Sequence, residues 1–228
     1  MRPGEGSTGN GLRPGILFDV DGTLVDTNYL HTLAWSRALR DADEWAPMNA
    51  IHRLVGMGGD QLIPRLLGHD SPAALDARRP RYRELLPEAR AFPGATDLLQ
   101  EVHGRGLAVV LATSSPSDEL EVLVALLEAD DSIDATTSAD DVEASKPAPD
   151  VLLCALASAG VDPGRALVVG DSVWDVEAAI AAGLGCLTVE TGGFSREELG
   201  DAGAIGVFRD VAELLEGVKG GLLGWLAA

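Results

Sequence analysis

The chain has 228 residues and a mass of 23.7 kDa, the size of one domain or of one domain with a sizeable insertion. Hydrophobic residues make up 46% of it and charged residues 23%, close to globular averages, which excludes a disordered or fibrous chain. The 17 basic and 36 acidic residues give a net charge of −19, so we expect neither a nucleic-acid nor a membrane partner, because both surfaces are anionic.

The apolar stretches and the cysteines indicate the compartment. The longest apolar runs, such as 107–112, are far shorter than the ~18 residues that a membrane span needs. No apolar stretch of the kind found in a secretory signal precedes Ile16. The two cysteines are far apart in sequence and indicate neither a disulfide framework nor a zinc site. We therefore expect a cytoplasmic protein. Its oligomeric state stays open, and a monomer is compatible with the sequence.

Along the chain, a short tail is followed by alternating strands and helices. Residues 1–15 hold five glycines and two prolines, which predicts a flexible tail. Apolar runs typical of buried strands then occur at Ile16–Phe18, Leu107–Ala112, Ala166–Val169 and Cys186–Val189. Helical patterns lie between the later runs, at Thr96–His103, Asp118–Glu128, Asp150–Ala159 and Val173–Ala182. This alternation predicts an α/β fold with a parallel sheet.

The segment Thr27–Ala91 interrupts the alternation. It contains no clear strand, and helices are predicted at Tyr29–Leu39, Asp60–Leu67 and Ala73–Leu86, the last kinked or split at Pro80. Nine basic and eight acidic residues give it a net charge of +1, whereas the rest of the chain carries −20. We therefore expect three parts: the tail 1–15, a core made of 16–26 and 92–228, and a helical insertion at 27–91.

Polar residues follow three of the predicted strands. Asp19 comes directly after Phe18, Thr113 follows Ala112, and Asp171 follows the run that ends at Gly170. Because the carboxyl ends of parallel strands meet at one edge of a sheet, these residues are expected to converge there. Lys146, in a proline-rich loop, is a candidate fourth member, since basic residues are scarce outside the insertion.

The stretch Asp19-Val20-Asp21-Gly22-Thr23 carries two carboxylates two residues apart. One can attack a bound group as nucleophile while the other moves a proton. Gly22 permits a turn, and Thr23 with the nearby amides can bind phosphoryl oxygens. A hairpin beginning at Asp21-Gly22 is the alternative, but it leaves Asp19 unexplained.

A metal site is predicted around Asp171 and Asp175. They lie four residues apart at a strand-to-helix turn, where like charges repel by ~0.2–0.5 kcal/mol unless a cation neutralises them. With Asp19 and Asp21 they form an oxygen-rich set suited to Mg²⁺. The alternative is that Asp171 or Ser172 only caps the following helix.

Thr113, Ser114 and Ser115 precede Pro116, which predicts a helix with Ser115 at its N-cap. Hydroxyl groups at a helix N-terminus are also ready phosphate ligands. Lys146 supplies the cation needed to hold an anionic nucleophile and an anionic substrate together.

Taken together, these residues resemble the four motifs of the haloacid dehalogenase-like hydrolases. The resemblance spans residues 16 to about 215 and implies a Rossmann-like, doubly wound core. It also implies Asp19 as nucleophile, Asp21 as general acid/base, Thr113 and Lys146 on the phosphoryl group, and Asp171 on Mg²⁺. The insertion resembles the helical cap of the subgroup of phosphoglycolate phosphatases, sugar-phosphate phosphatases and β-phosphoglucomutases. The subgroup places His31 at the entrance, and Gly58, in the loop Gly56-Met57-Gly58-Gly59, is expected to face the substrate.

Departures from the family pattern narrow the expected activity. An aspartate at position 21 is not found in true dehalogenases, and residues 27–91 lack the cap lysine of phosphonatases. The loop 56–59 lacks the arginine with which β-phosphoglucomutases grip a second phosphate, although Arg53 or Arg65 could replace it. We therefore expect a Mg²⁺-dependent phosphatase acting on a sugar phosphate or a phosphoglycolate-like metabolite, with a phosphomutase as the alternative.

A receiver-like signalling domain is the alternative from another functional class, because it also forms an aspartyl phosphate on a doubly wound sheet. Receivers place the phospho-accepting aspartate at the third strand and lack a helical insertion. The order of motifs in this chain argues against that interpretation.

Overall fold

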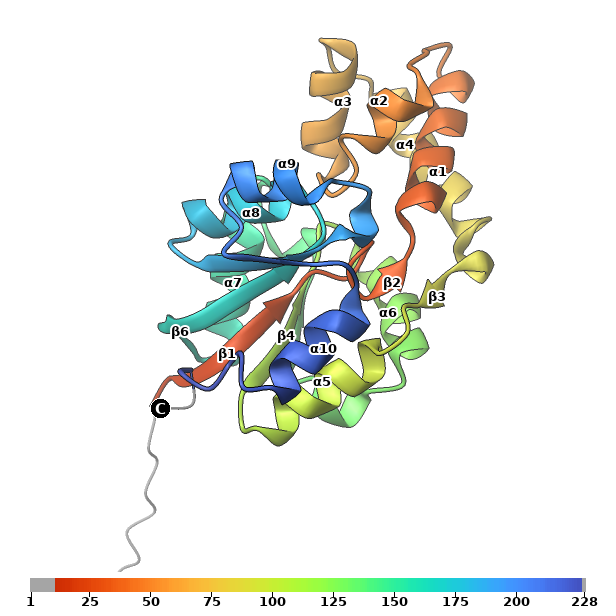
Figure 1. The fold of residues 1–228 in the computed structure, drawn as a ribbon. Helices are drawn as coiled ribbons and strands as arrows, with labels where there is room; N and C mark the ends of the chain where they lie inside the picture. Colours follow the sequence, from red (N-terminus) through yellow and green to blue (C-terminus); the bar gives the residue numbers. More distant parts are fainter. Residues whose placement is uncertain (1–10, 227–228) are drawn as a thin grey trace, which may run out of the picture.

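The computed structural model describes residues 11–226, which form a layered α/β core with a helical bundle beside one edge of the sheet (Figure 1). Most of the predicted tail, residues 1–10, lies outside the described residues. The first strand begins at Arg13, inside the segment expected to be tail.

Six strands form one parallel sheet in the order β5-β4-β1-β6-β7-β8. Their bounds are β1 (Arg13–Phe18), β4 (Ala108–Ala112), β5 (Ala135–Thr137), β6 (Val161–Gly170), β7 (Gly185–Val189) and β8 (Gly206–Phe208). Because β1 pairs with both β4 and β6, the strand order reverses at β1. In open sheets of this kind, ligands bind at the carboxyl ends of the strands beside the reversal. The predicted Rossmann-like parallel fold is confirmed.

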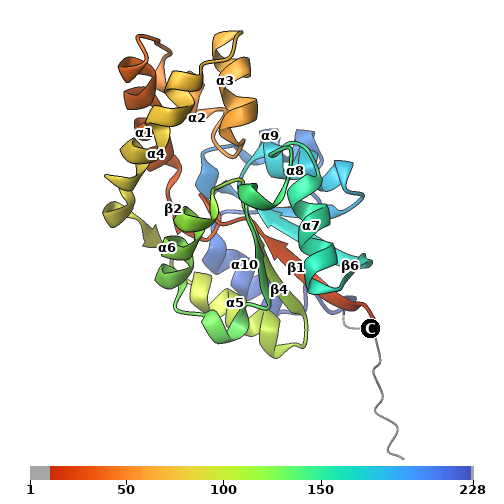
Figure 2. The same ribbon diagram turned by 180° about the vertical axis from the view of Figure 1, so that it is seen from behind.

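Helices cover both faces of the sheet, as the two opposite views show (Figures 1 and 2). One face packs against α5 (Ala95–Gly104), α6 (Ser117–Leu127) and α10 (Val211–Lys219). The other packs against α7 (Asp150–Ala159) and α8 (Val173–Ala181), and α9 (Arg196–Ala202) lies beside α8 and β8. Strand residues alternate between the two apolar cores: Ile16 and Phe18 face the first, and Leu17 faces the second.

The insertion contains four helices: α1 (Asn28–Asp41), α2 (Met48–His52), α3 (Gly59–Leu67) and α4 (Pro72–Arg83). They enclose an apolar cluster of their own that includes Trp35, Leu39, Ile51 and Leu62. Pro80 lies within α4 without splitting it, and α4 ends at Arg83, before a short 3₁₀ turn at Leu86–Glu88. The 27–91 segment therefore buries apolar surface independently of the sheet.

Two short strands connect the insertion to the core. β2 (Val25–Asp26) pairs antiparallel with β3 (Arg90–Ala91), so the chain leaves and re-enters the core at one place. The expectation of no strand in 27–91 is wrong at its last two residues. A second local correction concerns α6, whose N-cap is Pro116 and not Ser115, so the helix begins at Ser117.

Some elements were not anticipated from the sequence. The edge strands β5 and β8 have three residues each, and α2, α9 and α10 were also missed. Short 3₁₀ turns complete the chain at Asp130–Ser132, Ala139–Asp141 and Glu190–Gly192. Among residues 11–226, no helix combines the length and apolar character that a membrane crossing requires.

Candidate functional site

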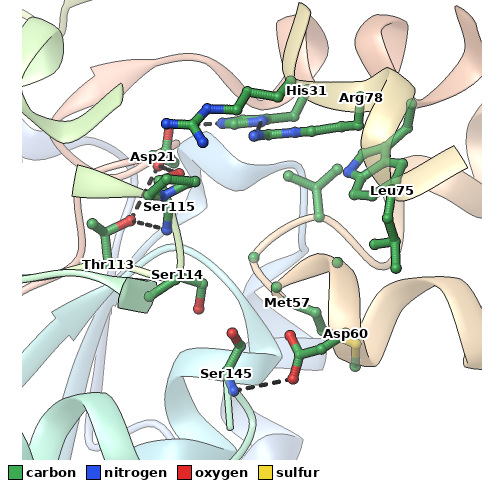
Figure 3. A pocket seen from close by; sticks show the side chains of 18 of the residues that line it. Asp21, His31, Met57, Asp60, Leu75, Arg78, Thr113, Ser114, Ser115 and Ser145 are labelled. Carbon is green, nitrogen blue, oxygen red and sulfur yellow. Dashed lines mark hydrogen bonds and ion pairs between the residues drawn. The ribbon is translucent and has the colours of Figure 1, made fainter. Parts of the chain in front are cut away.

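A cavity of about 380 Å³ lies between the carboxyl ends of the strands and the helical insertion (Figure 3). Its core side is formed by Asp19, Asp21 and the loop 113–116 after β4. Its other side is formed by residues of α1 and α4 and by the loop Gly56–Gly59. The reversal of strand order at β1 therefore opens onto a space that the insertion covers.

Asp19 and Lys146 form a buried ion pair at the base of this cavity. Lys146 Nζ lies 2.5 Å from Asp19 Oδ1 and 2.8 Å from Asp175 Oδ1, and it donates to the Ala112 carbonyl at 3.1 Å. Burial lowers the pKa of Lys146, but the two carboxylates outweigh burial and keep its pKa above the usual range. Burial raises the pKa of Asp19 to about 7, although Lys146 opposes the shift. Lys146 thus remains a cation beside Asp19.

Asp171 lies next to this pair at the end of β6. Its carboxylate accepts hydrogen bonds from Asn28 Nδ2 at 2.7 Å and from Thr23 Oγ1 at 3.0 Å. Thr23 is fully buried and also donates to Asp19 at 3.2 Å, so its hydroxyl group lies between the two carboxylates. Gly22 has φ +78°, and a Cβ there would collide with Asn28 and Asp171. Glycine at this position therefore permits both the turn and the approach of Asp171.

The carboxylates of Asp19, Asp171 and Asp175 fit a divalent cation. One oxygen from each lies within 4.8 Å of the others, and all three residues are buried. Burial, followed by repulsion from Asp175 and Asp19, raises the pKa of Asp171 well above its usual range. Lys146 pairs with two of these three carboxylates, Asp19 and Asp175, and supplies one positive charge, so a cation with two charges would balance the cluster.

The alternative expected for Asp171 or Ser172 was that one of them only caps the following helix. In the structure, Ser172 and Asp175 together cap α8. Ser172 is the N-cap of α8 and accepts from the Asp175 amide, while Asp175 Oδ2 accepts from the Ser172 amide and hydroxyl. Asp175 therefore caps the helix with one oxygen and pairs with Lys146 through the other. Asp171 is left free of a capping role.

The carboxylate of Asp21 is not part of the three-residue cluster and lies among hydrogen-bond donors. Oδ1 accepts from Thr27 at 2.7 Å and contacts His31 Nε2 at 2.8 Å, and Oδ2 accepts from Ser115 at 2.7 Å and Thr113 at 3.2 Å. Burial raises the pKa of Asp21, but these partners outweigh burial and hold its pKa well below the usual range. In this arrangement Asp21 is ionised.

His31 connects Asp21 to the insertion. Its ring stacks on Tyr82 with centroids 4.0 Å apart, and its Nδ1 lies 2.7 Å from Arg78 Nη2. A guanidinium can only donate, so Nδ1 accepts and the ring hydrogen lies on Nε2, pointing to Asp21. Arg78 also donates to both oxygens of Glu119 at 2.7 Å, and the Glu119 side chain is 0% exposed. A chain of contacts thus runs from α6 through α4 to Asp21.

The remaining predicted site residues lie around the cavity. Ser114 Oγ is buried and has no hydrogen-bond partner among the described residues, so it is available to an incoming oxygen. Thr113 Oγ1 is engaged with Asp21 and with the Ser115 amide. Gly58 lines the cavity, where a Cβ would collide with the Ser145 side chain.

Several residues of the site were missed from the sequence, notably Asn28, Tyr82 and Arg78. Ser115, which was expected at the start of a helix, donates to Asp21. Thr27 and Asn28 directly follow β2, so their place at the start of the first inserted helix was the available signal. The arginine-rich run of α4 was visible only as part of the insertion's basic charge. Arg53 and Arg65, named as possible phosphate ligands, do not line the cavity: Arg53 pairs with Glu198, and Arg65 lies over the Trp174 ring.

Comparisons with known proteins agree on the family. Residues 14–183 match the haloacid dehalogenase-like hydrolase family. A phosphoglycolate phosphatase of Rhodospirillum rubrum is 35% identical over 214 residues, which cover 87% of this chain and 88% of that protein. The fructose-1-phosphate phosphatase YqaB of Escherichia coli is 30% identical, with 77% of this chain and 95% of the relative covered. The crystal structure of a hydrolase from Pseudomonas syringae superimposes with a TM-score of 0.85 at 31% identity, covering 91% and 99% of the two chains.

Proposed function

The chain belongs to the haloacid dehalogenase-like hydrolases, and on that premise we propose that it is a Mg²⁺-dependent phosphatase of small phosphorylated metabolites. The reaction proceeds through an aspartyl phosphate on Asp19. The observation that carries this proposal is the buried Asp19–Lys146 ion pair at the base of a cavity that also holds Asp21. The relatives that act on phosphoglycolate and on fructose 1-phosphate support the substrate class.

In the first step, the Asp19 carboxylate attacks the phosphorus atom and the alcohol oxygen of the substrate leaves. Lys146 balances the charge of the nucleophile and of the phosphoryl oxygens, and Ser114 Oγ donates a hydrogen bond to one of those oxygens. Thr113 assists from the same loop. A Mg²⁺ ion held by Asp19, Asp171 and Asp175 would supply further electrostatic stabilisation of the phosphoryl group.

Asp21 moves the protons of both steps. As an acid it protonates the leaving oxygen, and as a base it activates the water that cleaves the aspartyl phosphate. The hydrogen bonds around Asp21 hold it ionised, which suits the second step. The first step requires a protonated Asp21, and so part of this set must be released when the substrate enters. Because His31 and Tyr82 belong to the insertion, movement of the insertion changes the protonation of Asp21.

The helical insertion, 27–91, serves as a cap over the core made of 16–26 and 92–228. The paired strands β2 and β3 form the joint between these two parts. The contact between α4 and α6 holds the cap beside the cavity, and closure of the cap during the reaction would exclude water from the site. The absence of Arg53 and Arg65 from the cavity favours a phosphatase over a mutase, since neither residue is placed to grip a second phosphate.

Phosphate release from p-nitrophenyl phosphate and a panel of sugar phosphates tests the proposal. We expect turnover with Mg²⁺, none in excess chelator, and none for Asp19→Asn, while the exposed control Asp201→Asn keeps full activity. Activity of Asp19→Asn equal to that of the native protein would refute the mechanism. A single phosphorylation of each chain without turnover would favour the receiver-like alternative.

A further inference from the structure

The part of the cavity away from Asp19 has an unusual balance of charge. Two arginines line it, Arg78 and Arg79, and both belong to α4. Arg78 is buried against Glu119, whose carboxylate accepts two hydrogen bonds from one guanidinium nitrogen. The unpartnered Nε–H of Arg78 can still donate to a neutral hydroxyl oxygen, but the positive charge is balanced.

Arg79 has carboxylates near it as well. It shares Asp118, at the start of α6, with Arg83. Hydrogen bonds from Ser117, together with the charge of Arg79, lower the pKa of Asp140, so two carboxylates face these two guanidinium groups. Both arginines that line the cavity are therefore committed to carboxylates of the core. Among the described residues, the cavity has no lysine or arginine beyond these two in its lining.

Two carboxylates of the same lining have no cation. Asp60 accepts a hydrogen bond from the Ser145 amide at 3.3 Å and one from Gln61 at 3.1 Å, and Figure 3 shows its carboxylate directed toward Ser145. Glu143 is exposed and lines the cavity beside Ser145. Within residues 11–226, neither carboxylate takes part in an ion pair. The space for the leaving group is therefore bounded by uncompensated negative charge.

The rest of that space is apolar. Trp35, Val55, Met57 and Leu75 contribute side chains from three parts of the cap. An apolar wall with a few polar groups suits the carbon skeleton and hydroxyls of a sugar or polyol, and it offers nothing to a second anion.

From this balance we infer that the substrate's leaving group carries no second anion. It is a neutral or amine-bearing sugar or polyol, and not a phosphoglycolate-like acid or a bisphosphate. The inference rests on the proposed phosphatase function and makes Asp60 and Glu143 determinants of its specificity. The net charge of −19 acts in the same direction, because every additional negative charge on the substrate weakens its approach.

Matched pairs of substrates test the inference, with inorganic phosphate release as the readout. Sorbitol 6-phosphate and 6-phosphogluconate differ by a hydroxymethyl group in place of a carboxylate, and 2-hydroxyethyl phosphate and phosphoglycolate differ in the same way. We expect kcat/KM for the neutral member to exceed that of the acid about tenfold in each pair, corresponding to roughly threefold for each carboxylate of the cavity. Added salt should narrow this ratio, since it screens the repulsion.

Two variants locate the effect. Asp60→Asn keeps an acceptor for the Ser145 amide, and Glu143→Gln alters an exposed side chain, so both remove charge with little change of shape. Each should lower the neutral-to-acid ratio about threefold. Glu121→Gln is the matched control, because Glu121 lines a separate groove beside α6 and should leave the ratio unchanged.

A preference for the acid in both pairs, or the same change of ratio in Glu121→Gln as in the two cavity variants, would overturn the inference while leaving the proposed function intact. Release of no phosphate from any of these substrates or from p-nitrophenyl phosphate would instead refute the proposed function, and the inference with it.

Discussion

The ion pair between Arg78 and Glu119 should dominate the attachment of the cap to the core. The Glu119 side chain is 0% exposed and that of Arg78 is 12% exposed, with two hydrogen bonds of 2.7 Å between them. Arg78→Met keeps most of the apolar stem but leaves a buried carboxylate without a counter-charge. Breaking a buried pair by removing one partner costs about 3–5 kcal/mol. We therefore expect a loss of this size in the free energy of unfolding, measured by urea denaturation.

The neighbouring arginine provides the matched control. Arg79 pairs with Asp118 at the surface, with side-chain exposures of 48% and 33%, so Arg79→Met should cost at most about 1 kcal/mol. The double variant Arg78→Met/Glu119→Met removes both buried charges and should recover most of the lost stability. It should nevertheless stay less active than the native protein, because His31 has still lost the donor to its Nδ1. Equal losses in Arg78→Met and Arg79→Met, or a double variant as unstable as Arg78→Met, would refute this reasoning.

Three further predictions concern the reaction. Asp21→Asn should lower kcat by ~10²–10⁴-fold, because it removes the proton-transfer group. Circular dichroism should show an unchanged fold. A kcat within twofold of the native value would contradict the role of Asp21 in proton transfer. Gly58→Ala should raise KM, because the added methyl group would collide with Ser145 and hold the cap away from the core. The control Gly104→Ala adds a methyl group in open space and should leave KM unchanged. Equal KM values for the two variants would contradict cap closure at Gly58. Incubation with β-glucose 1-phosphate and a trace of the bisphosphate should give inorganic phosphate and little glucose 6-phosphate, and efficient isomerisation would favour the mutase.

The residues at the strand ends could be predicted to meet because the geometry of a parallel sheet alone brings them together. Asp19, Asp171 and Lys146 are far apart in sequence, yet the end of each strand fixes where the residue after it must lie. Apolar runs were sufficient to locate β1, β4, β6 and β7, whereas the edge strands β5 and β8 have three residues each and no recognisable pattern.

The direction of individual side chains was not accessible in the same way. The hydroxyl group of Thr23, for example, contacts Asp19 and Asp171, and Asp171 lies 148 residues away in the sequence. The role of Arg78 depends on how α4 docks on α6, a contact between elements about 40 residues apart that no local pattern encodes. Sequence patterns thus placed the backbone positions of the site, and tertiary contacts decided which of their side chains act together.

Trapping the aspartyl phosphate tests the central claim most directly. The protein is mixed with Mg²⁺ and sorbitol 6-phosphate, quenched in acid during turnover, digested, and analysed by mass spectrometry, with Asp21→Asn run in parallel to slow the second step. The account predicts the mass of one phosphoryl group on the peptide that contains Asp19, located at Asp19 and more abundant in Asp21→Asn. Continued phosphate release with no phosphoryl group on Asp19, or with the group on Asp21 or Ser114, would contradict it.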